Sequence, residues 1–103
     1  MTDQSRFSRY KHYAKDAYYH LYNRGNGRQN IFHSKEDYLF YINRLDRYIK
    51  KYDVELIAYV LMPNHIHLLA KQKTDIPIYK FVASLHTSYS IYFNKKNKHV
   101  GHV

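Results

Sequence analysis

The hydrophobic and polar positions of this chain follow two different periods, one typical of strands and one of helices. Residues 17–23 are rich in β-favouring Tyr and Leu and precede the turn-forming run Arg24-Gly25-Asn26-Gly27, which predicts a first strand. Residues 54–62 are rich in β-branched and apolar side chains and predict a second strand. Pro63-Asn64 favours a tight turn, so residues 65–71 are predicted to return as a third strand in a hairpin.

Two other segments repeat apolar residues every three or four positions, as the buried face of a helix does. The first is predicted to begin after Ser34, with Asp37 three residues on as a variant of the capping box. Its predicted buried positions are Tyr38, Ile42, Leu45, Ile49 and Tyr52. The second follows Pro77, and its predicted buried positions are Ile78, Phe81, Val82, Leu85, Tyr89, Tyr92 and Phe93.

The predicted order β-α-β-β-α gives five of the six elements of a ferredoxin-like β-α-β-β-α-β unit. We therefore predict an α+β fold with an antiparallel sheet and both helices on one face. Gly101-His102-Val103 could begin the last strand. We divide the chain into a basic N-terminal arm, residues 1–16, and one domain, residues 17–103, that is incomplete at its C-terminal end.

The net charge of the chain indicates which class of partner it could bind. Lys and Arg number 17 against 8 acidic residues, a formal charge of +9, which favours a polyanion such as nucleic acid. The alternative is a solvated basic surface that only aids solubility. The chain has no Cys, which excludes disulfides, thiolate metal sites and a cysteine nucleophile. No apolar run approaches the ~20 residues of a transmembrane helix and no signal peptide is visible, so we expect a cytoplasmic protein without a membrane partner.

The candidate chemistry lies in His65-Ile66-His67. Side chains two residues apart on a strand project from one face, so the two imidazoles could converge on a divalent metal, on the sheet face opposite the helices. A chain with 8 His also forms such pairs by chance. A histidine-triad nucleotide hydrolase would need a third His where Leu69 stands, and the chain has no His-Glu-x-x-His protease motif, Walker loop or nucleophile elbow.

Three blocks of the sequence together resemble the single-tyrosine HUH transposases, most closely the REP-associated tyrosine transposase group. Residues 61–69, Leu-Met-Pro-Asn-His-Ile-His-Leu-Leu, are similar to the HUH block of that group. Residues 19–32 resemble its first block, residues 85–94 resemble the helix after the HUH strand, and residues 101–103 look like the start of the next block. The resemblance runs from about Tyr18 to Val103.

This resemblance implies an enzyme that cuts and rejoins DNA. It implies that His65 and His67 ligate Mg²⁺ or Mn²⁺, and that a tyrosine attacks a phosphate to give a 5′-phosphotyrosine and a free 3′-OH. The implied substrate is single-stranded or hairpin DNA in transposition, handled by a homodimer without a nucleotide cofactor. The nucleophilic tyrosine of the family lies beyond the block that begins at Gly101. We therefore expect it beyond Val103, which would make this chain either a truncated gene product or a fragment of a longer protein.

Other residues are candidates for supporting roles. Tyr89 and Tyr92 are the remaining candidates for the nucleophile, although their apolar spacing favours a place in the core. Contacts to DNA phosphates are predicted for Arg24, Arg28 and Lys71, each of which could instead be solvated surface. A further set would share one face of the first strand, either to stack unpaired bases or to fill the core. It comprises Tyr18, His20 and Tyr22.

Three alternatives to the enzyme stay open at this point. The chain could be a catalytically inactive, nucleic-acid-binding remnant of such a transposase. It could bind RNA as an RRM-like sheet, although the third strand lacks the Lys/Arg-Gly-Phe/Tyr-Gly/Ala-Phe block of that class. It could also be a nonfunctional fragment that folds only as a swapped or strand-sharing dimer, because its own sheet lacks an edge strand.

Overall fold

The computed structural model describes residues 13–98, and their elements follow the order predicted from the sequence. The bounds are Tyr18–Arg24 (β1), Asn26–Arg28 (the 3₁₀ helix η1), Lys35–Tyr52 (α2), Val54–Met62 (β2), His65–Gln72 (β3) and Ile78–Asn97 (α3). The α+β class and the antiparallel sheet are thereby confirmed. Most of the basic arm predicted for residues 1–16 lies outside the described residues, as does the possible last strand at residues 101–103.

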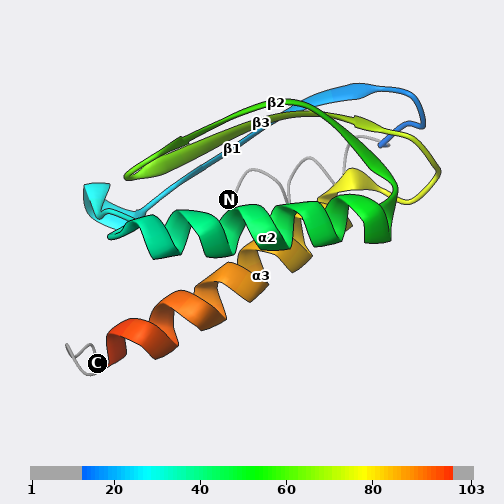
Figure 1. The fold of residues 1–103 in the computed structure, drawn as a ribbon. Helices are drawn as coiled ribbons and strands as arrows, with labels where there is room; N and C mark the ends of the chain where they lie inside the picture. The colour runs from blue at the N-terminus through cyan, green and yellow to red at the C-terminus, as the bar shows by residue number, and fades with distance from the viewer. Residues whose placement is uncertain (1–12, 99–103) are drawn as a thin grey trace.

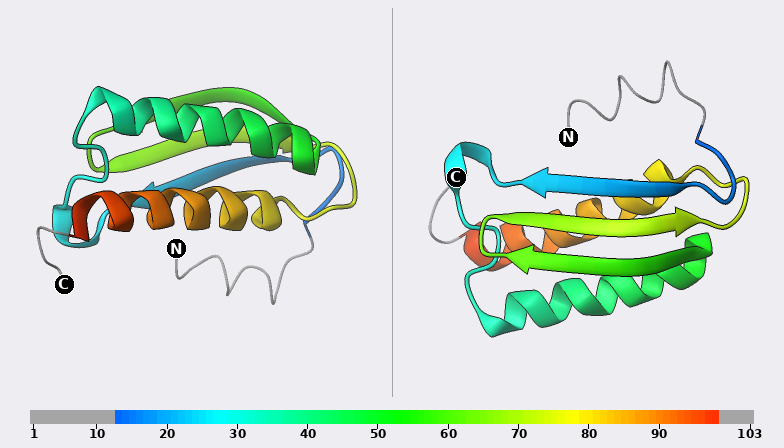
Figure 2. Two further views of the ribbon diagram at one scale, coloured as in Figure 1. Left: turned by 60° about the horizontal axis from the view of Figure 1, so that its bottom comes forward. Right: turned by 90° about the horizontal axis from the view of Figure 1, so that it is seen from above.

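The three strands form an antiparallel sheet in the order β1-β3-β2, so the strand that carries His65 and His67 is the central one. His67 lies opposite Tyr22 of β1 and Val60 of β2. Both helices cover one face of the sheet (Figure 1), and the view from above in Figure 2 shows the strands in front of the helices. Among the described elements, none covers the other face, which we call the open sheet face.

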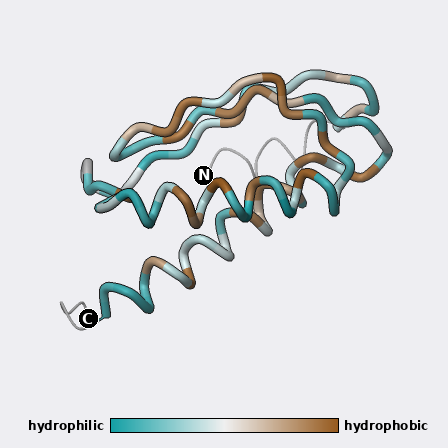
Figure 3. Tube along the Cα trace, in the orientation of Figure 1, coloured by the Kyte–Doolittle hydropathy of each residue, from teal (hydrophilic) through white to brown (hydrophobic). Residues whose placement is uncertain are grey.

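The core lies between the sheet and the helices. Ile66, Leu68 and Ala70 project from β3 towards the helices and are almost completely buried. Each fully buried Leu or Ile contributes about 1.5–3 kcal/mol relative to an exposed one. The apolar segments of the strands and the hydrophilic last turns of α3 are visible in Figure 3. The remaining buried apolar residues are Leu21, Phe32, Tyr41, Leu45, Val54, Ile78, Phe81, Val82, Leu85 and Tyr89.

The buried face of α2 differs from the prediction. The sequence predicted Ile42 in the core, but this prediction was wrong, because its side chain is 37% exposed. The buried residues are Asp37, Tyr41 and Leu45, so the buried stripe is turned towards the side of Asp37. A carboxylate can occupy the buried face only when its charge is compensated, and apolar periodicity alone does not reveal such compensation.

Asp37 owes its burial to hydrogen bonds that join the two helices. Its carboxylate accepts from His33 N at 2.7 Å, Tyr92 OH at 2.7 Å and Lys96 Nζ at 2.8 Å. Burial alone would raise the pKa of Asp37, but the bonds from Lys96, Tyr92 and His33 hold that pKa at about 2. Ser34 caps the helix as predicted, since its Oγ accepts from Asp37 N at 3.4 Å. The last turn of α3 is thereby tied to the first turn of α2.

Candidate active site on the open sheet face

His65 and His67 lie together on the open sheet face, as the two-residue period of a strand predicts. Their ring centroids are 5.1 Å apart and the rings are perpendicular. The neighbouring strand β1 adds a third imidazole, because His20 Nε2 lies 2.8 Å from His67 Nδ1 and the two rings stack. Tyr22 completes the cluster, with its ring centroid 4.8 Å from that of His67 and 5.9 Å from that of His65.

The hydrogen bonds of the two β3 imidazoles leave one nitrogen of each free. His65 Nδ1 lies 2.8 Å from Asn64 Oδ1, an oxygen that only accepts, so this nitrogen donates and Nε2 is the nitrogen that a metal ion could bind. His67 uses Nδ1 to pair with His20. Partial burial, and then the nearby His20 and His65, lower the pKa of His67, which favours its neutral form. Neither Nε2 atom is hydrogen-bonded to another described residue.

Two imidazoles whose Nε2 atoms form no hydrogen bond with the described residues fit part of a divalent metal site. Within residues 13–98, however, no group of three or more His, Asp or Glu side chains is arranged to hold a metal ion. Mg²⁺ and Mn²⁺ prefer oxygen ligands, so the described residues offer two candidate nitrogen ligands, and the oxygen ligands of such a site would have to come from other groups.

The turn before His65 is held by the segment that follows β1. Gly25 N donates to Asn64 O at 2.9 Å, and Ile31 N and Phe32 N donate to Pro63 O at 2.7 and 3.1 Å. Gly25 is required here because a Cβ would lie 2.3 Å from the Gln29 carbonyl oxygen. The blocks at residues 19–32 and 61–69 therefore meet in space, and residues 25–32 hold the backbone of the turn from which His65 projects.

Comparison with known proteins adds the family. A family model described as IS200-like transposase matches residues 13–103, which is most of the chain. The chain belongs to the IS200-like transposase family. No curated protein and no solved structure gave a match. Membership assigns this domain to transposition and DNA recombination in general. Among the described helices, neither α2 nor α3 is long and apolar enough to cross a membrane.

For a transposase, the residues around the histidines are candidates for contacts with DNA. Arg24 is exposed and lies opposite His65 in the strand register, while Lys71 lies opposite Tyr18 at the other end of β1. Lys71 Nζ is 5.6 Å from the Tyr18 ring centroid and 3.9 Å from Asp16 Oδ1. Arg28 is the last residue of η1. The structure therefore brings Arg24 and Lys71 to the open sheet face at its two ends.

Tyr18, His20 and Tyr22, which alternate along β1, lie outside the core. Tyr18 is 60% exposed, Tyr22 is 44% exposed, and His20 is exposed beside them. Apolar side chains of the other strands continue this surface, among them Val60, Met62 and Leu69. Of the two interpretations of the β1 aromatics, the core is thus excluded and an exposed surface remains. The contact of His20 with His67 could not be found from the sequence, because it depends on the pairing of β1 with β3.

Tyr89 and Tyr92 lie on α3, on the opposite side of the sheet from the histidines. Tyr89 is buried and its hydroxyl donates to Ile31 O. Burial and the nearby Asp37 raise the pKa of Tyr89 well above its usual value. Tyr92 OH donates to Asp37 Oδ1, and burial together with this bond raises its pKa as well. Both hydroxyls are therefore engaged on the helix side of the sheet, that of Tyr89 with the segment before α2 and that of Tyr92 with α2 itself.

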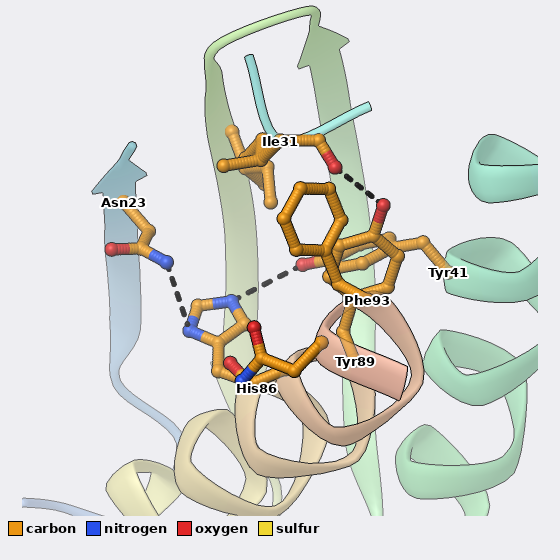
Figure 4. Close-up of a pocket in the computed structure, with 9 residues that line it drawn as sticks. Asn23, Ile31, Tyr41, His86, Tyr89 and Phe93 are labelled. Atoms are coloured by element: carbon orange, nitrogen blue, oxygen red, sulfur yellow. Dashed lines mark hydrogen bonds between the residues drawn. The ribbon is translucent and has the colours of Figure 1, made fainter. Parts of the chain in front are cut away.

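A second polar cluster lies beneath β1 and was not assigned any role from the sequence. His86 of α3 points between Asn23 and Tyr41, with Nδ1 3.5 Å from Asn23 Nδ2 and Nε2 3.3 Å from Tyr41 OH (Figure 4). These residues line a cavity of about 100 Å³ together with Ile31, Tyr89 and Phe93. Burial lowers the pKa of His86 to about 4, so its ring is neutral near pH 7.

Proposed function

We propose that this transposase domain binds single-stranded or hairpin DNA on its open sheet face and catalyses metal-dependent strand cleavage and rejoining. The observation that carries the proposal is the His65–His67 pair, whose free Nε2 atoms lie on an exposed face. We assign His65 and His67 as ligands of Mg²⁺ or Mn²⁺, with DNA oxygens as further ligands. A homodimer is the expected assembly, by resemblance to the HUH transposases.

The exposed side chains around the pair suit a strand whose bases are unpaired. Rings such as those of Tyr18 and Tyr22 can stack bases, at about 1–3 kcal/mol per base. Arg24 and Lys71 lie at the two ends of the same face and can contact phosphates on either side of the histidines. A single strand running along β1 would thus place a phosphate near the pair while its bases rest on the aromatic rings.

The proposed reaction transfers the 5′-phosphoryl group of the DNA strand from a 3′ oxygen to the hydroxyl oxygen of a tyrosine. The hydroxyl oxygen of a tyrosine bonds to phosphorus while the bond from phosphorus to the 3′ oxygen breaks, and the proton that the tyrosine loses is balanced by the one that the 3′ oxygen gains, which gives a 5′-phosphotyrosine and a free 3′-OH. A metal bound at the pair would polarise the scissile phosphate. His20 acts as a positioning residue, because its contact with His67 Nδ1 fixes the ring whose Nε2 faces outwards.

DNA binding without cleavage is the second candidate function. The places of Tyr89 and Tyr92 favour it, since both hydroxyls are engaged on the helix side of the sheet. Among the described tyrosines, Tyr22 contacts both His65 and His67 and is the candidate that the geometry offers for attack. Whether the domain contains a tyrosine that can attack the phosphate therefore decides between the two functions.

A cleavage assay with matched histidine variants tests the proposal. A labelled hairpin DNA with single-stranded flanks is incubated with Mn²⁺ and the chain, and covalent protein–DNA adducts are separated by denaturing electrophoresis. His65→Ala should abolish the adduct and weaken Mn²⁺ binding, measured by titration calorimetry, by about tenfold or more. His33→Ala, which removes an exposed histidine outside the open sheet face, should leave both unchanged.

The outcomes separate the candidate functions. An adduct that survives in His65→Ala would refute the assignment of the metal ligands. An adduct lost in Tyr22→Phe would identify Tyr22 as the nucleophile. Binding of the hairpin without an adduct would support the second function, and absence of both binding and adduct would overturn the proposal.

A further inference from the structure

The helix layer carries a groove on its outer surface, between α2 and α3. It is lined by Tyr48 and Lys51 of α2 and by Ala83, Ser84, Thr87, Ser88 and Ile91 of α3. Because the helices cover the inner face of the sheet, this groove and the open sheet face belong to different surfaces of the molecule (Figure 2). Nothing in the proposed cleavage reaction uses the groove, so its chemistry is a separate question.

The α2 side of the groove is positively charged. Lys51 is the cation that lines the groove, and Arg44 and Arg47, one turn before Tyr48 and Lys51, extend the same flank of α2 without lining the groove themselves. The guanidinium carbon of Arg44 is 4.7 Å from the centre of the Phe40 ring, which itself stacks on Tyr92 of α3. Within residues 13–98, the buried Nε of Arg44 has no hydrogen-bond partner. Among the ion pairs of the described residues, none involves Arg44, Arg47 or Lys51.

The α3 side supplies hydroxyl groups and no opposing charge. The sequence of α3 contains no Asp or Glu. Thr87 and Ser88 form no side-chain hydrogen bond with another described residue, whereas Ser84 pairs with Tyr52 at 2.6 Å. Arg, Lys and hydroxyl side chains are the groups that contact the phosphates and sugars of DNA. The one ring among the lining residues, that of Tyr48, is half-buried, so the groove lacks the exposed rings that stack unpaired bases.

We propose that this groove binds the sugar–phosphate backbone of a duplex segment of the DNA substrate. A site with cations and hydroxyls but no stacking surface suits a strand whose bases face away, as they do in a duplex. Arg44 and Lys51 are seven residues apart, about 10 Å along a helix, which matches about three base-pair steps of one strand. The choice of DNA rests on the proposed function, but binding in the groove needs neither the metal nor cleavage.

Two double variants that remove the same charge from the same helix test the groove. Arg47→Gln/Lys51→Gln removes the exposed cation that lines the groove and the exposed cation one turn before it, and Lys35→Gln/Lys50→Gln removes two exposed cations that lie away from the groove. Binding of a 20-base-pair blunt duplex and of single-stranded oligothymidylate is measured by fluorescence anisotropy at several NaCl concentrations, without divalent metal. Circular dichroism at each NaCl concentration is used to check that the variants are folded.

The groove variant should weaken duplex binding by about tenfold or more at ~0.1 M salt and lower the salt slope by about 2, since each phosphate contact contributes about 0.9. The control pair should change duplex affinity by less than about threefold, because distant charges are screened. Oligothymidylate should bind both variants alike.

An equal loss of duplex affinity in the two double variants would overturn the proposal, because affinity would then depend on the total charge and not on the position of the cations at the groove. Equal loss of duplex and oligothymidylate in the groove variant would also overturn it. A groove variant that changed the oligomeric state in gel filtration, with duplex binding intact, would assign the groove to a second copy of the chain. Failure of cleavage in the metal-dependent assay would leave these measurements valid, so the two proposals can fail separately.

Discussion

Acid should destabilise this domain through a single buried histidine. His86 is neutral in the fold, where Asn23 and Tyr41 contact its two nitrogens and burial lowers its pKa to about 4 from the ordinary 6.5. An amide NH₂ group can only donate, so Nδ1 of His86 accepts and Nε2 carries the proton. Protonation of Nδ1 would direct a proton and a charge at that amide. The fold therefore resists protonation of His86, whereas the unfolded chain does not.

The sign and size of the effect follow from the two pKa values. Because the pKa in the folded state is the lower one, the unfolded chain binds more protons between pH 6.5 and 4, and stability falls as the pH falls through that window. Above about pH 6.5 the stability is fully present. At 1.36 kcal/mol per pKa unit, the loss reaches about 3 kcal/mol below pH 4 and about 2.5 kcal/mol at pH 4.5. That is a large share of the ~5–15 kcal/mol of a typical domain.

Urea unfolding followed by far-ultraviolet circular dichroism measures the effect, with free energies of unfolding determined at steps from pH 8 to pH 4.5. The His86→Gln variant should be less stable at pH 8 but should lose about 2.5 kcal/mol less than the original chain over this range. His33→Gln, which removes an exposed histidine, should follow the original chain. Parallel curves for the original chain and His86→Gln would refute the reasoning, because the titrating group would then lie elsewhere.

Two further predictions concern the packing that supports the site. Gly25→Ala should destabilise the domain by about 1–3 kcal/mol, because its Cβ would overlap the Gln29 carbonyl, and should speed hydrogen exchange of the Ile31 amide. The control is Gly27→Ala, whose Cβ would meet open space. Because φ is +57° there, this variant should cost about 1 kcal/mol, but it should leave the Ile31 amide protected. Asp37→Asn should lower the free energy of unfolding at pH 7 by about 2–3 kcal/mol, measured by thermal unfolding. The original chain should lose stability as the pH falls from about 4 to 2, because Asp37 becomes protonated, and the variant should lack this loss. Glu36→Gln, which changes an exposed carboxylate, should alter the stability little.

The elements of the fold were predictable because their periods are local properties of the sequence. The turn at Pro63-Asn64 and the cap at Ser34 are encoded within a few residues, and the bounds of the strands and the starts of both helices agree with the prediction to within one residue. The placement of His65 and His67 on the open sheet face follows from the two-residue period in the same way. Local sequence was sufficient for each of these features.

Features that depend on pairing between distant segments could not be predicted. The contact of His20 with His67 depends on the register of β1 against β3, and the burial of Asp37 depends on Lys96, 59 positions along the chain. The register shift between Leu56 and Ala58 likewise has no marker in the sequence. Each of these features depends on a contact with a residue that is distant in the sequence, and a single sequence does not show which distant residues are in contact.

The short segment between β1 and α2 has a mechanical consequence. At one end it is bonded to the turn before His65, through the carbonyls of Pro63 and Asn64, and at the other end His33 is bonded to Asp37, which holds Lys96 of α3. A force applied to the turn would therefore be passed through this segment into both helices instead of bending the sheet alone. The domain should behave as a stiff frame of fixed thickness, and DNA that touched both of its surfaces would have to span that thickness.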